Sequence, residues 1–244
     1  MSKGTSSRLC VVAFGAHAGD MEITAGGTIA KYAERGDRVV IVHALKPSGM
    51  WARPPGLTAE EYSEKRTGQA LEVGKALGVE KVIFLGYKEG IPVDHEEMRL
   101  KVCDLVRELR PDLVLTHWKG SYHSDHIMTH LNVTEGLVYA QSDSVKRRDN
   151  SHKVRAVFYP ENWEDPEGFT PEVYVDISNA FRRYVDAISI YDFTNGKYSG
   201  FNYIEYYSSL CRVRGIEAGF ERAEAFMSPN DWAVKRQRLQ FLPI

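Results

Sequence analysis

Residues 9–45 of the chain read LCVVAFGAHAGDMEITAGGTIAKYAERGDRVVIVHAL. Two continuous apolar runs of strand length, residues 9–14 and 38–45, flank a helical pattern over residues 24–35 that ends at Gly36. Such a succession predicts a βαβ unit, because parallel neighbouring strands need a crossover connection, and that crossover is almost always right-handed. The expected fold is therefore of the α/β class.

The alternation of strands and helices continues along the rest of the chain. We predict further helices over residues 58–77, 96–109, 124–141 and 179–191, and further strands over residues 82–85, 113–117, 154–159 and 173–177. Thr58 is expected to begin the first of these helices, because Glu60 and Glu61 are favourably placed in its first turn. Ser178 is expected to cap the last, because a hydroxyl can accept a hydrogen bond from a free backbone N–H.

These elements predict one domain over residues 1–244, a Rossmann-like three-layer sandwich with a mostly parallel sheet. The pattern beyond Asn195 is helical and aromatic, so residues 195–244 are expected to form a C-terminal helical and aromatic extension. No G-x-G-x-x-G motif follows the first strand, and no acidic residue ends the second, which disfavours dinucleotide binding.

The composition narrows the class of protein. The chain has 244 residues with 31 Lys and Arg against 33 Asp and Glu, a balance that argues against nucleic acid as a partner. It has neither a run of about 18 apolar residues nor a signal-peptide pattern, so we expect no membrane span. Cys10, Cys103 and Cys211 form no CxxC pair, which is typical of a cytoplasmic protein with buried thiols.

Histidines gather where the fourth predicted strand ends. The chain has 8 histidines, and four of them, His117, His123, His126 and His130, lie in residues 117–130. Clustered imidazoles near carboxylates indicate a metal site, and this mixture of ligands suits Zn²⁺.

A second polar cluster follows the first predicted strand, where His17 and Asp20 stand three residues apart. Since ligands bind outside the carboxyl ends of the strands in open α/β sheets, the two clusters are expected to meet at one edge. Three protein ligands from two strand ends would leave a fourth position for water, as in catalytic zinc sites.

Two motifs resemble those of a known family. AHAGDMEITAGGTIAKYAERGDRVVIV, residues 16–42, resembles the opening of the LmbE-like, or PIG-L, zinc-dependent deacetylases, whose signature reads A-H-P-D-D-x-E before a G-G-T helix. HSDH, residues 123–126, resembles their second signature, H-P-D-H. Weaker similarities at residues 60–79, 82–90, 173–178 and 219–226 extend the resemblance over nearly the whole chain.

The resemblance implies an LmbE-like fold and a set of site residues. It assigns His17, Asp20 and His126 as the ligands of one Zn²⁺ per chain. Of the catalytic residues, His123 is implied to stabilise the tetrahedral intermediate, and Asp125 to orient a neighbouring imidazole, a role that metal sites commonly need.

The resemblance also implies the reaction: zinc-dependent hydrolysis of an N-acyl, usually acetyl, group from an N-acetylglucosamine-type sugar or conjugate, a small-molecule substrate. Relatives often form homo-oligomers, and we expect one here. Candidate substrate-binding residues are Arg53, Tyr122 and Trp118. For Arg53 the alternatives are that it clamps an anionic or sugar group or that it is a surface residue. For Trp118 they are that it stacks on a sugar or that it packs inside the protein. Tyr122 lies one residue out of register with a tyrosine that acts as an oxyanion donor in some relatives.

One position departs from the family pattern. The first Asp of the first motif, taken as the general base, is Gly19 here, and glycine cannot move a proton. Either another group such as His123 or Asp125 serves, or the protein is a weakened enzyme, or the reaction is a hydration like that of 4-oxalomesaconate hydratase. Outside enzymes, the alternative is a binding protein with a degenerate site. Of the remaining histidines, His130 is expected to face a neighbouring helix, and His117 to line the pocket or to bond a ligating side chain.

Overall fold

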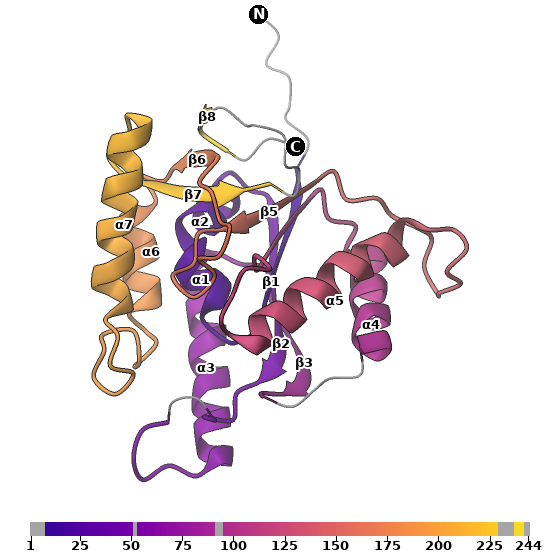
Figure 1. Cartoon of the computed structure of the whole chain (residues 1–244), viewed down its shortest axis with the longest axis horizontal. Coiled ribbons are helices and arrows are strands. Elements are labelled where there is room, and N and C mark those ends of the chain that lie inside the picture. The colour runs from indigo at the N-terminus through magenta and orange to yellow at the C-terminus, as the bar shows by residue number, and fades with distance from the viewer. Residues whose placement is uncertain (1–7, 51–52, 91–94, 229–236, 242–244) are drawn as a thin grey trace, which may run out of the picture.

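The computed structural model describes residues 8–50, 53–90, 95–228 and 237–241 (Figure 1). Its elements, in chain order, are β1 (Cys10–Gly15), α1 (Asp20–Thr24), α2 (Gly26–Glu34), β2 (Arg38–Lys46), α3 (Ala59–Leu77), β3 (Lys81–Lys88), α4 (His95–Leu109), β4 (Leu113–Thr116), α5 (Ser124–Gln141), β5 (Ala156–Pro160), β6 (Val173–Asp176), α6 (Phe181–Ile188), α7 (Tyr203–Ala218), β7 (Ala223–Met227) and β8 (Gln237–Leu239).

The described strands form one sheet in the order β3-β2-β1-β4-β5-β7-β6-β8. The first five are parallel to one another, whereas β7 runs antiparallel to both β5 and β6, and β8 is parallel to β6. This confirms the predicted Rossmann-like fold with a mostly parallel sheet. The chain builds outward from β1 to β3 and then returns to β4 on the other side of β1, so the strand order reverses between β1 and β4.

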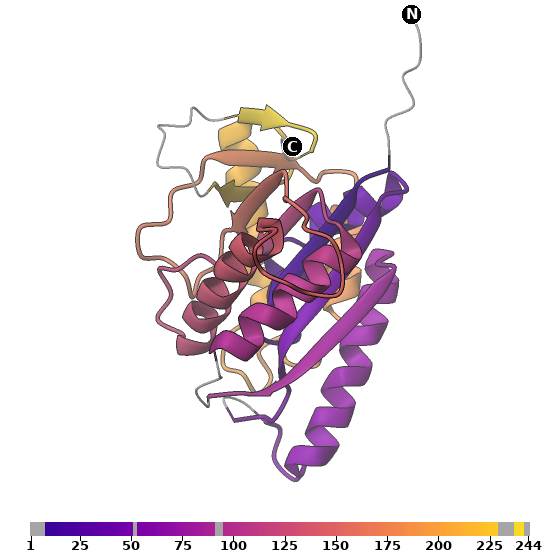
Figure 2. The same cartoon turned by 90° about the vertical axis from the view of Figure 1, so that its right-hand side faces the viewer.

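Helices cover both faces of the sheet, which gives three layers (Figures 1 and 2). Alternate residues of β1 point to opposite faces, as the pleat of a strand requires. Val11 and Ala13 pack in a core with α2, α3 and α6, whereas Val12 and Phe14 pack in a second core with α4 and α5. All four side chains are at most 2% exposed, so β1 is buried on both faces.

Local sequence signals explain where the long helix α3 begins and ends. Thr58 accepts a hydrogen bond from the backbone N–H of Glu61, and the Glu61 carboxylate accepts one from the N–H of Thr58, a complete capping box. Gly78 ends the helix in the left-handed conformation, at φ 82°. The predicted start at Thr58 is therefore confirmed.

The prediction that Ser178 caps a helix is wrong. Helix α6 begins only at Phe181, and the Ser178 hydroxyl instead donates to the Asp176 carboxylate at 2.6 Å. Residues 195–244, expected to be helical and aromatic, contain α7 but also β7 and β8, which join the sheet. The strand β7 reads AEAFM, and its polar Glu224 interrupts the apolar run that would have predicted a strand.

The three cysteines are buried and unpaired, as expected. Among the described helices, none is both long and apolar enough to cross a membrane.

Candidate metal centre

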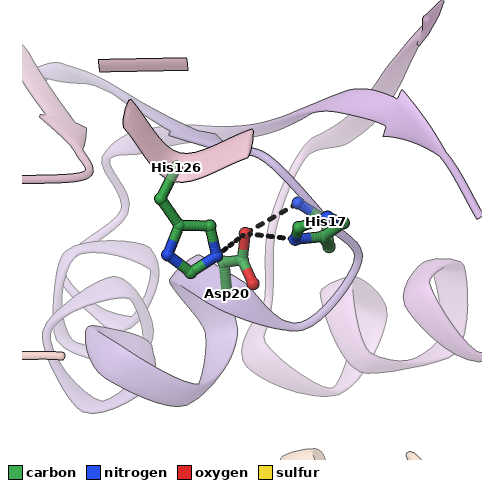
Figure 3. Close-up of side chains that lie close together, drawn as sticks. All are labelled: His17, Asp20 and His126. Atoms are coloured by element: carbon green, nitrogen blue, oxygen red, sulfur yellow. Dashed lines mark hydrogen bonds and ion pairs between the residues drawn. The ribbon is translucent and has the colours of Figure 1, made fainter. Parts of the chain in front are cut away.

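The site lies where the strand order reverses, at the carboxyl ends of β1 and β4. His17 stands in the loop after β1, Asp20 is the first residue of α1, and His126 lies in the first turn of α5. Figure 3 shows the three side chains converging on one point. The Asp20 Oδ2 atom is 3.5 Å from His17 Nδ1 and 3.7 Å from His126 Nε2, and it also accepts a hydrogen bond from the backbone N–H of His17 at 2.7 Å.

The His126 ring tests whether these residues fit a metal ion. Its Nε2 atom is buried without a hydrogen-bond partner, while its Nδ1 atom donates to Asp165 at 2.9 Å. Burial and the neighbouring His117 lower the pKa of His126 to about 4, so the ring is neutral and Nε2 carries a lone pair. A lone pair facing the Asp20 carboxylate is unfavourable unless a cation lies between them. Two imidazoles and a carboxylate, with ligand atoms within 4.8 Å of one another, fit one divalent ion.

Asp165 orients the imidazoles behind this point. This fully buried carboxylate accepts hydrogen bonds from Nδ1 of His126 and, at 3.1 Å, from Nδ1 of His117. Burial alone would raise the pKa of Asp165, but the two imidazole hydrogen bonds outweigh it and hold the pKa well below its usual range. His117 Nε2 in turn lies 3.0 Å from the Ala16 backbone nitrogen and 3.0 Å from Asp20 Oδ2. His117 therefore contacts the candidate ligand Asp20, which is one of the two alternatives expected for it.

Asp125 and His123 both lie beside His17. The Asp125 carboxylate is 3.1 Å from His17 Nε2, so it bonds an imidazole as expected. Burial lowers the pKa of His17, but Asp20 and Asp125 outweigh it and raise the pKa to about 10, which shows how strongly this pocket attracts positive charge.

The geometry also fixes the tautomer of His123. Its Nδ1 atom accepts a hydrogen bond from the backbone N–H of Asp125, and burial followed by the nearby His17 lowers its pKa. The neutral ring therefore carries its proton on Nε2.

A cavity of about 140 Å³ adjoins these groups. Sequence reasoning did not identify several side chains that line it, namely Tyr62, Arg66, Glu89, Glu164, Phe193 and Tyr203. Glu164 lies beside the candidate metal ligands, with Oε2 3.9 Å from His126 Nε2. Burial, and secondarily the Asp20 charge, raise the pKa of Glu164 to about 7.

One signal could have found Glu164 and Asp165. They follow β5, which lies next to β4 in the sheet, so their loop emerges at the same edge as the histidine cluster.

Gly19 occupies a position that a side chain would strain. Its φ is 120°, and a Cβ atom there would lie 3.0 Å from Phe193 Cζ. The backbone conformation and the aromatic ring together leave this position to glycine.

None of the three candidate substrate residues lines the cavity, although Arg53 lies against Gly49, which does. Arg53 is exposed. Tyr122 is 61% exposed, and its ring meets Trp163 in a T-shaped contact, with ring centroids 5.7 Å apart. Trp118 packs against Tyr159, and its Nε1 donates to the Glu167 carbonyl at 2.7 Å, which is the packing alternative.

His130 does not face a helix through its polar atoms. Its Nδ1 donates to the carbonyl of His117 at the end of β4, at 2.8 Å, and its ring lies beside Tyr159.

The chain is similar in sequence to a known protein family and to characterised enzymes. A family model described as PIG-L, GlcNAc-PI de-N-acetylase, matches residues 12–137. The chain is 31% identical over 160 residues to the 1D-myo-inositol 2-acetamido-2-deoxy-alpha-D-glucopyranoside deacetylase of Kineococcus radiotolerans, a match that covers 52% of this chain and only 44% of that protein. It is 24% identical to the 4-oxalmesaconate hydratase of Pseudomonas putida over 212 residues, 83% of this chain and 78% of that protein.

Among solved structures, the hydratase GalB of Pseudomonas putida matches with a TM-score of 0.82. The match covers 94% of this chain and 99% of GalB at 21% identity, and it shows a shared fold.

Proposed function

The chain belongs to the PIG-L (GlcNAc-PI de-N-acetylase) family, and from this membership we propose that it is a zinc-dependent hydrolase that removes an N-acyl group from an N-acetylglucosamine-type sugar or conjugate. The observation that carries the proposal is the unpartnered Nε2 atom of His126, buried opposite the Asp20 carboxylate. Deacetylases among the relatives support hydrolysis as the reaction.

His17, Asp20 and His126 would hold the zinc ion, which supplies Lewis-acid chemistry toward a substrate carbonyl. In this proposal the acyl group lies in the cavity with its oxygen near His123. Because the neutral His123 ring carries a proton on Nε2, it can donate a hydrogen bond to the oxygen that becomes negative during attack. Asp125 keeps His17 oriented through its hydrogen bond to Nε2.

Glu164 is placed to carry the proton that Gly19 cannot. It enters the cavity from the loop after β5, beside His126 Nε2, and therefore comes from a different strand end than the usual base. Oε2 would take a proton from the attacking water and release it to the leaving amine. A pKa of about 7 suits a group that must both accept and donate near neutral pH.

A second candidate is hydration of an unsaturated carboxylic acid, and Arg66 favours it. This buried guanidinium lines the cavity, and its Nε and Nη1 atoms lack hydrogen-bond partners. A cation there complements a carboxylate on the substrate. The similarity to a hydratase, which covers 83% of this chain, also supports a hydration reaction.

The test begins with metal analysis of the purified chain. We expect about one zinc ion per chain, turnover of an N-acetyl sugar or an unsaturated dicarboxylate, loss of turnover with a chelator and recovery with Zn²⁺. His126→Ala should lose the metal and the activity, whereas His152→Ala, remote from the cavity, should keep both. A chain that binds such ligands equally well without metal and turns over neither would be a binding protein with a degenerate site.

Glu164 gives the second part of the test. Glu164→Gln should lower kcat by about 10²–10⁴-fold with the zinc content unchanged. Glu167→Gln, in the same loop but exposed, is the matched control. Full activity in Glu164→Gln would assign the proton transfer to another group. The homo-oligomer expected from the resemblance stays a prediction, which the hydrodynamic mass would check.

A further inference from the structure

Three buried polar side chains beneath the β1 loop have no part in the reaction proposed above. Glu22 on α1, His43 on β2 and Tyr191 after α6 are each 0% exposed. His43 Nε2 lies 3.2 Å from Glu22 Oε1, and the Tyr191 hydroxyl donates to the same oxygen at 2.8 Å. Buried ion pairs are often no more stabilising than well-packed apolar side chains, so stability alone explains this cluster poorly.

The cluster contacts the chain next to both ligands that follow β1. His43 Nδ1 donates to the backbone carbonyl of His17 at 3.1 Å. Glu22 stands two residues after Asp20 on the short helix α1. With Nδ1 against the His17 carbonyl and Nε2 3.2 Å from Glu22 Oε1, the His43 ring joins the His17 backbone to the helix that bears Asp20.

We propose that Glu22, His43 and Tyr191 are positioning residues that hold His17 and Asp20 at the separation a bound metal requires. Rigid support of this kind is what allows a metal site to bind without first reorganising its ligands. The inference rests on the metal site of the proposed function.

Tyr191 also connects residues 17–22, the segment that bears His17 and Asp20, to the cavity wall. Two residues further along, Phe193 lines the cavity and lies against Gly19. Residues 191–193 therefore contact residues 17–22 twice, through the Tyr191 hydroxyl and through the Phe193 ring.

The test is the zinc affinity of the full chain carrying Tyr191→Phe, measured by competition with a chromogenic chelator at fixed pH. Loss of the hydroxyl should weaken zinc binding about tenfold, the lower end of what supporting residues of metal ligands contribute. Tyr174→Phe is the matched control, since Tyr174 is also buried and also donates to a glutamate, Glu217, at 3.1 Å, but on β6. It should lose stability without losing zinc affinity.

A double variant, Glu22→Gln with His43→Phe, removes the contact with the His17 carbonyl without leaving a lone buried charge, and it should weaken binding at least as much. Wild-type zinc affinity in Tyr191→Phe and in the double variant would overturn this inference alone. Equal loss of affinity in Tyr174→Phe would also overturn it, because the effect would then be general destabilisation. A wild-type chain that takes up no divalent ion would overturn the proposed function and this inference with it.

Discussion

Replacing Asp165 by asparagine should weaken metal binding, although Asp165 is not itself a candidate ligand. Its two carboxylate oxygens accept the Nδ1 protons of His126 and His117. An asparagine of the same shape has one oxygen and one NH₂ group, so one of the two rings must then face a donor. If that ring is His126, its proton moves to Nε2, the atom that faces Asp20, and the lone pair needed for the metal is lost.

The size of the effect follows from these contacts. Supporting partners of ligating histidines typically contribute 10–100-fold in metal affinity, which corresponds to about 1.4–2.7 kcal/mol. The 2.9 Å bond to His126 is the shorter of the two, and Asp165 is fully buried, so water cannot replace the lost acceptor. We therefore expect an effect at the upper end, about 100-fold.

Chelator competition at pH 7.5 measures the zinc affinity directly, and thermal unfolding of the metal-free protein measures the accompanying loss of stability. Asp37→Asn is the control: Asp37 is buried and accepts from the Leu9 N–H at 2.9 Å, but it lies at the opposite end of β1. It should destabilise the protein and leave zinc affinity unchanged. An Asp165→Asn chain that binds zinc as tightly as the wild type would refute the view that this carboxylate selects the tautomer of His126.

Three further predictions concern stability. Gly19→Ala should lower the free energy of unfolding by about 1–2 kcal/mol, because φ is 120° and the new methyl group meets Phe193; urea unfolding identical to wild type would contradict this. Arg107→Met should cost about 2–4 kcal/mol, since the guanidinium donates to four carbonyls, three of them at the end of α5, and an unchanged melting temperature would show that those carbonyls find other donors. Burial raises the pKa of Glu224 to about 7 in the folded chain, so the native state holds this proton more tightly than the unfolded state. The contribution of Glu224 to the free energy of unfolding should therefore fall as pH rises from about 4.5 to 7, by up to about 3 kcal/mol. Glu224→Gln should flatten that part of the profile of stability against pH.

The meeting of the candidate ligands at one edge of the sheet was predictable because they follow buried strands. His17, Asp20 and His126 stand close to the ends of β1 and β4, and strand ends can be found from apolar runs. The sheet then brings the two ends together, because neighbouring parallel strands finish at the same edge.

Glu164 and Asp165 could not be assigned in the same way. The motif NWEDPEG contains no histidine, and polar residues in a loop are usually solvated, so nothing in its composition distinguishes a buried carboxylate from an exposed one. Their importance depends on β5 lying next to β4, a fact of pairing and not of composition.

The C-terminal strands escaped prediction for a related reason. Glu224 interrupts the apolar run of β7, yet its carboxylate is buried because it accepts the backbone N–H groups of Gly27 and Thr28 at the start of α2. A contact between residues almost 200 positions apart leaves no periodic pattern in the sequence.

The cavity wall has a consequence for how this scaffold could diversify. The candidate ligands come from the part of the chain that the family model matches, residues 12–137, whereas Glu164, Phe193 and Tyr203 come from beyond it. Substitutions in the later part can therefore reshape the substrate pocket while the ligand set stays in place. The half that carries the candidate ligands can in this way be combined with different pocket walls, and the loop after β5 and the segment before α7 are the places where a protein engineer would begin.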